Sequence, residues 1–383
     1  MKEEIKKLVY ESIKAAKLLE SNDLVDVQIE ISRTKNPDHG QFSCNIALHL
    51  SKELGLNAVD LAHQIADKIN DQKSLEKIVV APPGFINFYL SEGVKAEVIK
   101  KVLKLGAEYG SKTIQEPKNI ILEFVSSNPT GPLHIGHGRH AAYGDSLAKL
   151  MRKAGHQVYT EYYVNDTGRQ MNIFALSVLI EILNLKGASL ALPRVSYQGA
   201  YLEQIAKKTQ NSIDVNFDSL LEHKDLKDSY ASCSADEEID KLIADFQNQL
   251  GIESFEKFTD SVSSLMVTTI KKDLEEFGVV YNNWFSEREM INKGLVQKSI
   301  KQLKDNNLTY KKGGALWLQT MNFGDDKDRV IIREDGRSTY FASDIAYHFD
   351  KRFRGFDVLL DVLGSDHHGY LARLGAGLAA MNE

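Results

Sequence analysis

The stretch that most constrains the fold of this chain is residues 119–164, which predicts a strand, a loop, a helix and a second strand. Residues 119–125 form a short apolar run without Gly or Pro, which is typical of a buried parallel strand. Residues 136–154 carry apolar side chains at helical spacing and end before Gly155, a common helix terminus. Residues 157–164 predict the second strand, so we expect an α/β protein with a parallel sheet.

The loop between the first strand and the helix ends in His134-Ile135-Gly136-His137. Loops after the carboxyl ends of parallel strands face the ligand crevice, and the next helix directs free N–H groups toward it. We therefore interpret His134, Gly136 and His137 as an ATP phosphate site, in which the two catalytic imidazoles stabilise charge on the α-phosphate and Gly136 lets the nucleotide approach the backbone. The alternative is that both histidines are ordinary loop and cap residues.

Composition excludes several classes of protein. The chain has 383 residues, 43% hydrophobic and 26% charged, as expected of a soluble globular protein with two or three domains. Its net charge of -6 means that a nucleic acid would have to bind a local basic surface. Neither a signal peptide nor a run of about 18 apolar residues is present. Two distant cysteines, Cys44 and Cys233, favour reduced thiols in the cytoplasm, and no metal site is expected.

Residues 1–110 predict a separate small α+β domain. In it we expect a helix near the start, an alternating strand through Val25, Val27, Ile29 and Ile31, helices from about Ser43 and Asp60, and a strand over 85–90. Residues 111–383 predict the α/β domain, with a mostly helical and polar insertion at about 176–260. Within that insertion, residues 217–240 are acidic and predict a solvated surface.

The remaining chain predicts the second half of the α/β domain. We expect a helix over 260–277, aromatic core residues at 281–285, a hairpin over 309–319 about Gly313-Gly314, and strands over 329–333 and 357–363. The last strand is followed by Gly364, which permits close approach, and by Asp366, whose carboxylate can accept from both hydroxyls of a ribose.

Several motifs carry a resemblance to a known family. His134–His137 resembles the first signature of the class I aminoacyl-tRNA synthetases, and the run Tyr162–Gln170 resembles arginyl-tRNA synthetase in particular. Matches at Gly40–Ser43, Pro83–Asn87 and Gly364–Tyr370 extend the resemblance over nearly the whole chain. It implies a class I synthetase-type, Rossmann-like parallel sheet with a helical insertion. It also implies that residues 1–110 are an N-terminal additional domain that contacts tRNA. The residues alone leave open the alternative that this domain only stabilises the protein.

The resemblance also implies an arginine site. Glu123 interrupts an apolar strand, and a buried carboxylate needs either an internal Arg or Lys or a cationic substrate. The resemblance favours the substrate and matches arginine-binding positions to Glu123, Asn128 and His134. It matches a guanidinium-contacting pair to Tyr340 and Asp344. The alternative is that Ser343 caps a helix beginning near Asp344, which then only favours the helix dipole.

For ATP, the resemblance implies contacts from Gly364, Asp366 and His367 to the ribose and adenine side. The function implied is that of an arginine-tRNA ligase, which activates L-arginine with ATP and Mg²⁺ and transfers it to tRNA(Arg). ATP with Mg²⁺ is then a substrate complex, and we expect no tightly bound cofactor, no protein partner and no membrane contact. Such catalysis by positioning needs no nucleophilic side chain.

The chain departs from the family at its end. It stops at Glu383 without a KMSK-like second signature or a helical anticodon-binding domain, and the basic run 351–354 instead predicts a helix terminus. We therefore expect an N-terminal fragment that binds its ligands weakly and charges tRNA poorly. Two other functions stay open, namely another HIGH-type nucleotidyltransferase and a non-catalytic tRNA-binding paralogue.

Overall fold

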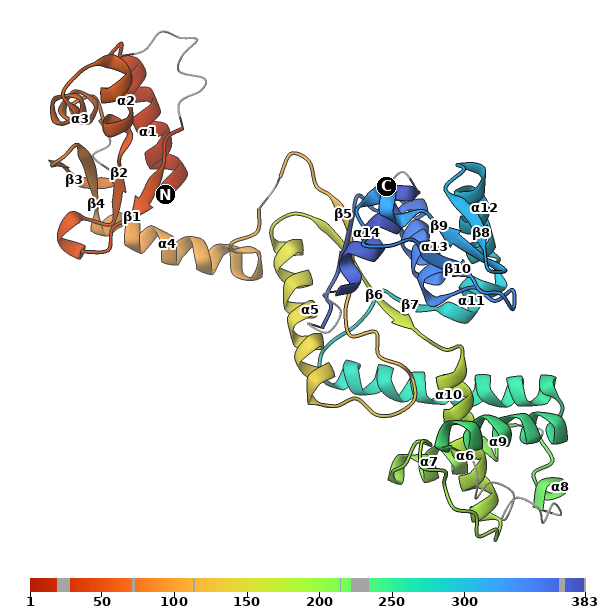
Figure 1. The fold of residues 1–383 in the computed structure, drawn as a ribbon. Helices are drawn as coiled ribbons and strands as arrows, with labels where there is room; N and C mark the ends of the chain where they lie inside the picture. Colours follow the sequence, from red (N-terminus) through yellow and green to blue (C-terminus); the bar gives the residue numbers. More distant parts are fainter. Residues whose placement is uncertain are drawn as a thin grey trace. The chain divides into compact units, whose positions relative to one another are not determined.

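The computed structural model describes residues 1–18, 28–70, 73–112, 114–213, 215–221, 234–364 and 369–381. The chain divides into two compact units, Met1–Gly110 and Ser111–Glu383 (Figure 1). Five residues that the sequence analysis singled out lie outside the described part of the chain, namely Val25, Val27, Cys233, Asp366 and His367.

The first unit contains an antiparallel sheet with strand order β1-β2-β4-β3. Its elements are α1 (Lys2–Ala15), β1 (Ile31–Arg33), η2 (Pro37–His39), β2 (Phe42–Cys44), α2 (Ile46–Leu54), α3 (Ala58–Ala66), β3 (Leu75–Ala81), β4 (Phe85–Leu90), α4 (Glu92–Leu105) and η3 (Gly106–Glu108). The predicted strand 85–90 is confirmed. The helix expected from about Ser43 begins later, because β2 is held in the sheet by β1 on one side and β4 on the other.

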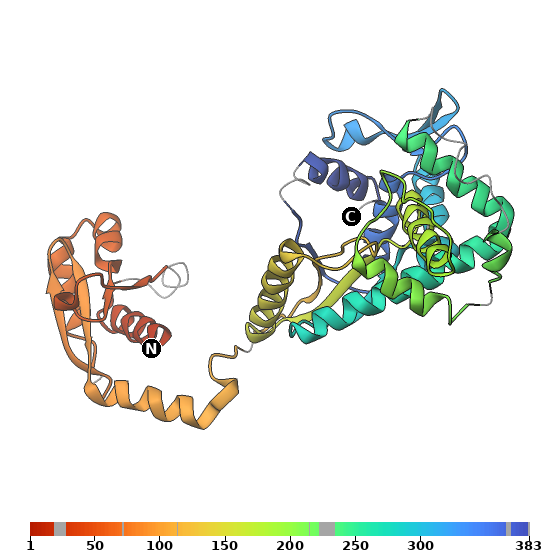
Figure 2. The same ribbon diagram turned by 90° about the horizontal axis from the view of Figure 1, so that it is seen from below.

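Helices α1, α2 and α3 pack against the sheet of the first unit, and α4 leads away from it (Figure 2). The core between them contains Ile5, Val9 and Ile13 of α1, all fully buried, as the helical spacing of these residues predicts. Phe42 and Phe88 pair across β2 and β4 and complete this core.

The second unit is built on a parallel sheet with strand order β11-β5-β6-β7. Its strands are β5 (Asn119–Glu123), β6 (Gln157–Val164), β7 (Asn283–Ser286) and β11 (Val358–Asp361). The predicted parallel sheet and the strand over 157–164 are confirmed. Strand β5 ends at Glu123 and not at Val125, because Val125 and Ser126 have positive φ values of 70° and 43° that turn the chain out of the sheet.

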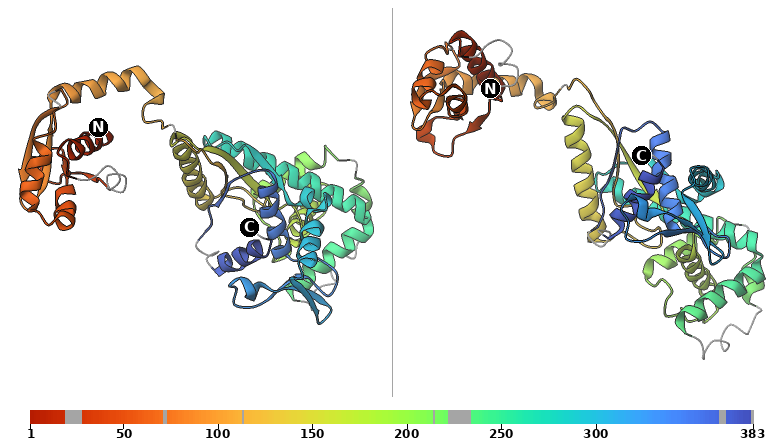
Figure 3. Two further views of the ribbon diagram at one scale, coloured as in Figure 1. Left: turned by 90° about the horizontal axis from the view of Figure 1, so that it is seen from above. Right: turned by 45° about the horizontal axis from the view of Figure 1, so that its top comes forward.

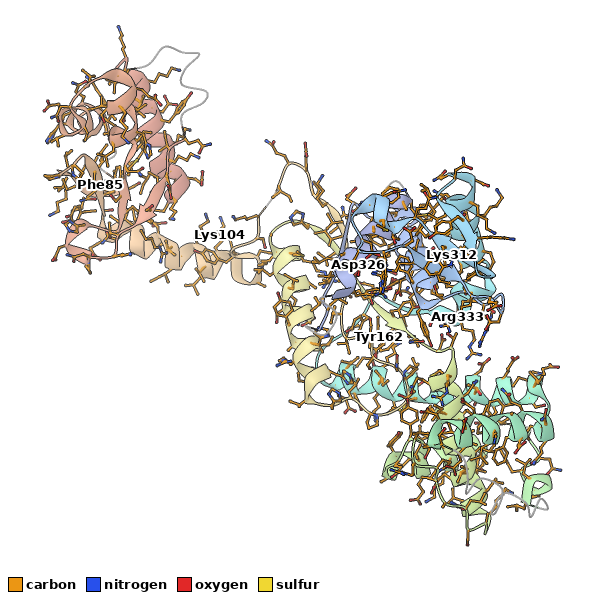
Figure 4. The ribbon with its side chains drawn as sticks, in the orientation of Figure 1. Phe85, Lys104, Tyr162, Lys312, Asp326 and Arg333 are labelled. Atoms are coloured by element: carbon orange, nitrogen blue, oxygen red, sulfur yellow. The ribbon has the colours of Figure 1, made fainter. Side chains whose placement is uncertain are left out.

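Helices cover both faces of this sheet, with α5 (Ile135–Lys153) on one face and α13 (Tyr340–Phe353) and α14 (Leu371–Ala380) on the other (Figure 3). The two faces alternate along β6. Tyr162 belongs to the core on the α5 side, whereas Tyr163 packs against the core that contains α13. Tyr162 is 1% exposed and lies near the middle of the unit (Figure 4).

The described residues between β6 and β7 form mostly helices, namely α6 (Arg169–Leu185), α7 (Ala200–Thr209), α8 (Asp218–Leu221), α9 (Ala235–Leu250) and α10 (Ile252–Glu276). They gather into a helical lobe beside the sheet (Figure 1). Helix α10 begins earlier than the predicted residue 260, directly after Gly251, whose φ is 82°. The prediction of a solvated surface over 217–240 is wrong for its described ends, because Phe217, Leu220 and Ile239 are buried in the core.

The rest of the second unit is a small antiparallel sheet of order β10-β9-β8 with flanking helices. Its elements are α11 (Glu287–Asn292), α12 (Leu295–Asp305), β8 (Thr309–Lys312), β9 (Ala315–Leu318), η5 (Thr320–Phe323) and β10 (Arg329–Ile332). The predicted hairpin about Gly313-Gly314 is confirmed. The aromatic residues at 281–285 are core residues as expected, since Trp284 stacks on Tyr162 with ring centroids 4.3 Å apart. None of the described helices is both long enough and apolar enough to cross a lipid bilayer.

The packing of α5 on β5 depends on a small residue at Gly144. A Cβ atom built there would lie 2.2 Å from the Phe124 ring, so even Ala cannot fit without displacing a core side chain. We expect Gly144→Ala to lower the free energy of unfolding by about 1–3 kcal/mol, measured by urea denaturation. Gly138→Ala on the same helix is the control. It meets no atom within 4 Å and should be neutral or slightly stabilising, and equal effects of both variants would contradict this packing argument.

Candidate active site

The two histidines of the HIGH motif lie at the N-terminus of α5. His134 is the N-cap residue, and its Nδ1 accepts a hydrogen bond from the backbone N–H of Gly136 at 3.1 Å. The Nδ1 of His137 accepts one from the backbone N–H of His134 at 3.3 Å, and the two rings stack with centroids 3.7 Å apart. The cap alternative is therefore correct as a description of their local contacts.

These contacts also determine which nitrogen of each ring is available to a ligand. A neutral imidazole that accepts at Nδ1 carries its proton at Nε2, so each ring keeps one N–H donor that its cap bond does not use. Burial lowers the pKa of His137, and the neighbouring His134 and His140 lower it further. Two stacked neutral rings at a helix N-terminus thus offer directed N–H donors to an anion.

The loop between β5 and α5 is tied down by contacts to β6 and α7. The Tyr162 hydroxyl accepts from the Ser127 backbone N–H at 3.0 Å, and the Tyr163 backbone N–H donates to Ser126 Oγ at 3.0 Å. The Tyr201 hydroxyl donates to the Thr130 carbonyl at 2.9 Å. Asn128 lies between these anchor points and is exposed, so its side chain projects from a fixed loop.

Three carboxylates lie side by side across the parallel sheet. Asp361, the last residue of β11, pairs in register with Glu123, the last residue of β5, and Glu123 pairs with Glu161 of β6. Residues in register on neighbouring strands point to the same face, so these side chains form one row, which Asn283 of β7 extends. We call Asp361, Glu123 and Glu161 the carboxylate row.

Helix α13 supplies the cations that the carboxylate row needs. Lys351 Nζ donates to Glu123 Oε2 at 2.7 Å and to Asp361 Oδ1 at 2.8 Å. Arg354 forms two hydrogen bonds to Glu161, at 2.6 and 2.8 Å, and the Tyr347 hydroxyl donates a third at 2.9 Å. Glu123 therefore has the internal lysine partner that the sequence analysis weighed against a cationic substrate.

The pKa values in the carboxylate row follow from these ion pairs. Burial raises the pKa of Glu161, but hydrogen bonds from Arg354 and Asn283 outweigh it, and the net pKa is lowered. For Asp361, the charge of Lys351 and a hydrogen bond from His348 likewise outweigh burial and lower the pKa. Glu161 and Asp361 are therefore ionised at neutral pH.

A second acidic pair, Asp344 and Glu287, lies beside the carboxylate row. Burial raises the pKa of the Tyr163 hydroxyl, and the nearby charges of Glu287, Asp344 and Glu123 raise it further. Asp344 accepts a hydrogen bond from the Tyr370 hydroxyl, and Thr167 Oγ1 donates to Glu287 Oε2 at 3.0 Å. Glu123 and Asp344 are thus in the same cluster, as the predicted arginine site requires.

The second acidic pair differs from the carboxylate row in lacking cations. Among the described residues, neither Asp344 nor Glu287 forms an ion pair with a lysine or arginine. Burial raises the pKa of Asp344, and the charges of Glu123 and Asp361 also raise it, whereas the Tyr370 hydrogen bond and the charge of His348 act in the opposite direction without cancelling the rise. Burial also raises the pKa of Glu287, with a contribution from Asp344. The pair is therefore short of positive charge.

The alternative that Asp344 only favours a helix dipole is wrong. Helix α13 begins at Tyr340 and not near Asp344, and its N-cap is Thr339, not Ser343. The chain enters the helix one turn earlier than expected because the Thr339 hydroxyl donates to the Val330 carbonyl of β10. Asp344 lies in the second turn, too far from the N-terminal N–H groups to cap them.

The other predicted site residues lie around these clusters. Tyr340 is 58% exposed at the start of α13, and a Cβ atom built at Gly168 would lie 3.3 Å from its hydroxyl. Gly364 is exposed three residues after the end of β11, and Asp366 and His367 fall outside the described residues. A cavity of about 470 Å³ lies between α5 and the end of β11 and is lined by Arg139, His140, Tyr143, Leu147, Leu360, Asp361, Val362 and Leu363.

Several polar residues of this region were not predicted, among them Glu287, Lys351 and Asp361. Lys351 had a recognisable signal, because it follows Asp344 and Tyr347 by seven and four residues and so shares the buried face of α13. Asp361 and Glu287 had none, since nothing in the local sequence indicates which strand ends meet. Among the described residues, no group of three or more His, Cys, Asp or Glu side chains is arranged to hold a metal ion.

Comparisons with known proteins identify the family of this chain. Residues 3–90 match the family model described as arginyl tRNA synthetase N terminal domain, and residues 98–382 match tRNA synthetases class I (R), catalytic domain. An arginine-tRNA ligase from Legionella pneumophila (strain Paris) is 40% identical over 361 residues, which are 93% of this chain and 61% of the relative. One from Vesicomyosocius okutanii is 39% identical and covers 100% of this chain and 66% of the relative.

Two solved structures are also similar. A putative arginyl-tRNA synthetase from Campylobacter jejuni has a TM-score of 0.62 and 32% identity, covering 77% of this chain and 58% of that one. The Thermus thermophilus arginyl-tRNA synthetase has a TM-score of 0.61 at 18% identity, covers 100% of this chain and 63% of its own, and supports the fold alone. The chain thus spans about three fifths of the length of its relatives. With both family models matched along most of its length, this chain belongs to the class I arginyl-tRNA synthetases.

Proposed function

We propose that the second unit carries the arginine and ATP sites of an arginine-tRNA ligase. In the proposed reaction, the carboxylate of L-arginine attacks the α-phosphorus of ATP, arginyl-adenylate forms and pyrophosphate leaves. A hydroxyl of the terminal ribose of tRNA(Arg) then attacks the acyl carbon, and AMP leaves. ATP enters with Mg²⁺ as a substrate complex, and the reaction belongs to the cytoplasm, where tRNA is charged.

The observation that carries this proposal is the unmatched negative charge of Asp344 and Glu287 next to Glu123. A guanidinium is planar, with five N–H donors in a fixed fork, and several convergent carboxylates satisfy it well. Lysine offers a point charge that cannot span two carboxylates in the same way. We therefore assign the arginine side chain to Asp344 and Glu287, with Tyr340 beside them. We assign Asn128 and the Oε1 atom of Glu123 to the same arginine site.

For ATP, the proposal rests on the cap of α5 and the cavity beside it. The Nε2–H groups of His134 and His137, with the backbone at Gly136, supply donors for the phosphates. The cavity between α5 and β11 has the volume of a small-ligand pocket. Gly364, Asp366 and His367 follow directly after its β11 wall, which supports assigning them to the ribose and adenine side.

We assign a tRNA contact to the first unit. Support comes from the family model that it matches over residues 3–90, which describes the N-terminal domain of arginyl tRNA synthetases.

Ligand-dependent melting tests the proposal directly. L-Arginine and ATP with Mg²⁺ are each expected to raise the Tm of this chain, because a ligand that binds only the folded state stabilises it by about 2.7 kcal/mol at a hundred times its Kd. L-Lysine at the same concentration is the control and should have little effect. Equal shifts with lysine and arginine would contradict the assignment of Asp344 and Glu287, and no shift with arginine or ATP would remove the proposed function.

Asp344→Asn is expected to separate arginine binding from ATP binding. The amide can still accept from Tyr370 but cannot pair with a guanidinium, so arginine binding should weaken by about 2 kcal/mol or more while ATP binding is retained. The Tm without ligand should stay the same or rise, since a buried carboxyl with a raised pKa is removed. Isothermal titration calorimetry provides both affinities. Asp335→Asn, at an exposed turn, is the matched control, and unchanged arginine affinity of Asp344→Asn would exclude Asp344 from the site.

Arginine binding is also expected to weaken as the pH falls. Because the pKa values of Asp344 and Glu287 are raised, these carboxyls take up protons above the ordinary carboxyl range, and a neutral carboxyl does not pair with a guanidinium. The arginine-induced rise in Tm should therefore shrink as the pH falls from neutral toward the ordinary carboxyl range. Glu287→Gln combined with Asp344→Asn should remove this dependence, and an arginine effect independent of pH in the unaltered chain would argue against the assignment.

A further inference from the structure

Lys351 forms ion pairs with two members of the carboxylate row, Glu123 at the end of β5 and Asp361 at the end of β11. Its side chain is fully buried, and its ammonium group lies between Glu123 Oε2 at 2.7 Å and Asp361 Oδ1 at 2.8 Å. The same group lies 4.2 Å from the centre of the Tyr347 ring. Asp361 uses its second oxygen for His348 Nε2 at 2.7 Å. Tyr347, His348 and Lys351, which make these contacts, all belong to α13.

Stability alone is a weak reason for such an arrangement. Moving an ammonium and two carboxylates out of water costs several kcal/mol per ion, and well-packed apolar side chains often stabilise a core equally well. The ion pairs do, however, orient the two carboxylates, because Lys351 bonds to one oxygen of Glu123 and one oxygen of Asp361. The other Glu123 oxygen, Oε1, accepts no hydrogen bond from a described residue, although the side chain is only 14% exposed.

The two strand ends that Lys351 holds lead to different parts of the proposed site. Glu123 is followed by the fixed loop that carries Asn128 and ends at His134. Asp361 lines the cavity beside α5 and is followed within three residues by Gly364. The Lys351 ammonium group therefore fixes the distance between Glu123, which precedes the loop of the proposed arginine site, and Asp361, which precedes the segment of the proposed ATP site.

From this geometry we propose that Lys351 is a positioning residue that couples the two ligand sites. It holds Glu123 with Oε1 available to the cationic amino acid, and it holds Asp361, which lines the cavity beside α5 assigned to the nucleotide. Without Lys351, the carboxylates of Glu123 and Asp361 would be adjacent in register with no cation between them, and they would repel each other or take up a proton. Both ligand sites would then change together. This inference rests on the proposed function.

Arg354 provides a matched control for Lys351. It also belongs to the end of α13, and it also neutralises a buried carboxylate of the row, Glu161. Glu161 is fully buried and bonded to Tyr347, Asn283 and Arg354, so it offers no oxygen to a ligand. Arg354→Met and Lys351→Met therefore remove comparable ion pairs. Only the carboxylates bonded to Lys351 belong to the proposed ligand sites.

The experiment measures the Tm and the affinities for L-arginine and ATP with Mg²⁺, by calorimetry, at a temperature where each variant is folded. Lys351→Met is expected to weaken binding of both ligands by about tenfold or more. Arg354→Met should lower the Tm but leave both affinities within about twofold of the unaltered chain. Lys351→Met binding both ligands normally, or Arg354→Met losing as much affinity, would overturn the proposal.

A second variant covers the case in which Lys351→Met does not fold. Lys351→Met combined with Asp361→Asn removes one cation and one carboxylate together, so the fold should recover. Arginine affinity should remain low, because Glu123 is still not oriented. If affinity returns with stability, Lys351 is only structural and the inference fails. Failure of the proposed function is distinguished by the unaltered chain: if that chain binds neither L-arginine nor ATP, the proposed function is wrong, whatever the variants do.

Discussion

The ion pairs between α13 and the carboxylate row are the interaction on which the second unit depends. Parallel register brings Asp361, Glu123 and Glu161 side by side, and three adjacent carboxylates on a covered face of a sheet cannot remain ionised without cations. Lys351 and Arg354 supply two positive charges from one helix face. The position of α13 on the sheet is therefore set by charge as well as by its apolar contacts.

The same helix explains why the proposed ligand site lies where it does. Tyr347, Lys351 and Arg354 bind the carboxylates of the row. Asp344, two turns before Lys351, forms no ion pair with a lysine or arginine in the described part of the chain. Glu287, at the start of α11, adds a second carboxylate there. The carboxylate row is thus neutralised by the protein and the adjoining acidic pair is not, which is why we propose that this pair binds the cationic ligand.

The HIGH motif shows that a structural contact and a ligand role can share one side chain. Each histidine uses Nδ1 to satisfy a backbone N–H at the start of α5. That bond places the ring proton on Nε2, directed away from the helix. The cap therefore orients the donors that the proposed phosphate site needs, and the two interpretations of the motif are compatible.

Local patterns in the sequence determined much of this protein. Apolar periodicity, Gly at turns and strand–loop–helix order predicted α5, β6, β4 and the β8–β9 hairpin, because these elements depend on residues close together in the chain. The sequence also indicated that Glu123 needs a partner. It did not identify Lys351, which is 228 residues away, nor did it bring Glu287 and Asp361 into the cluster. Strand order, register and helix docking decide which distant charges meet, and these depend on the packing of the whole unit. Only the tertiary structure therefore revealed which of the described carboxylates pair with a lysine or arginine and which do not.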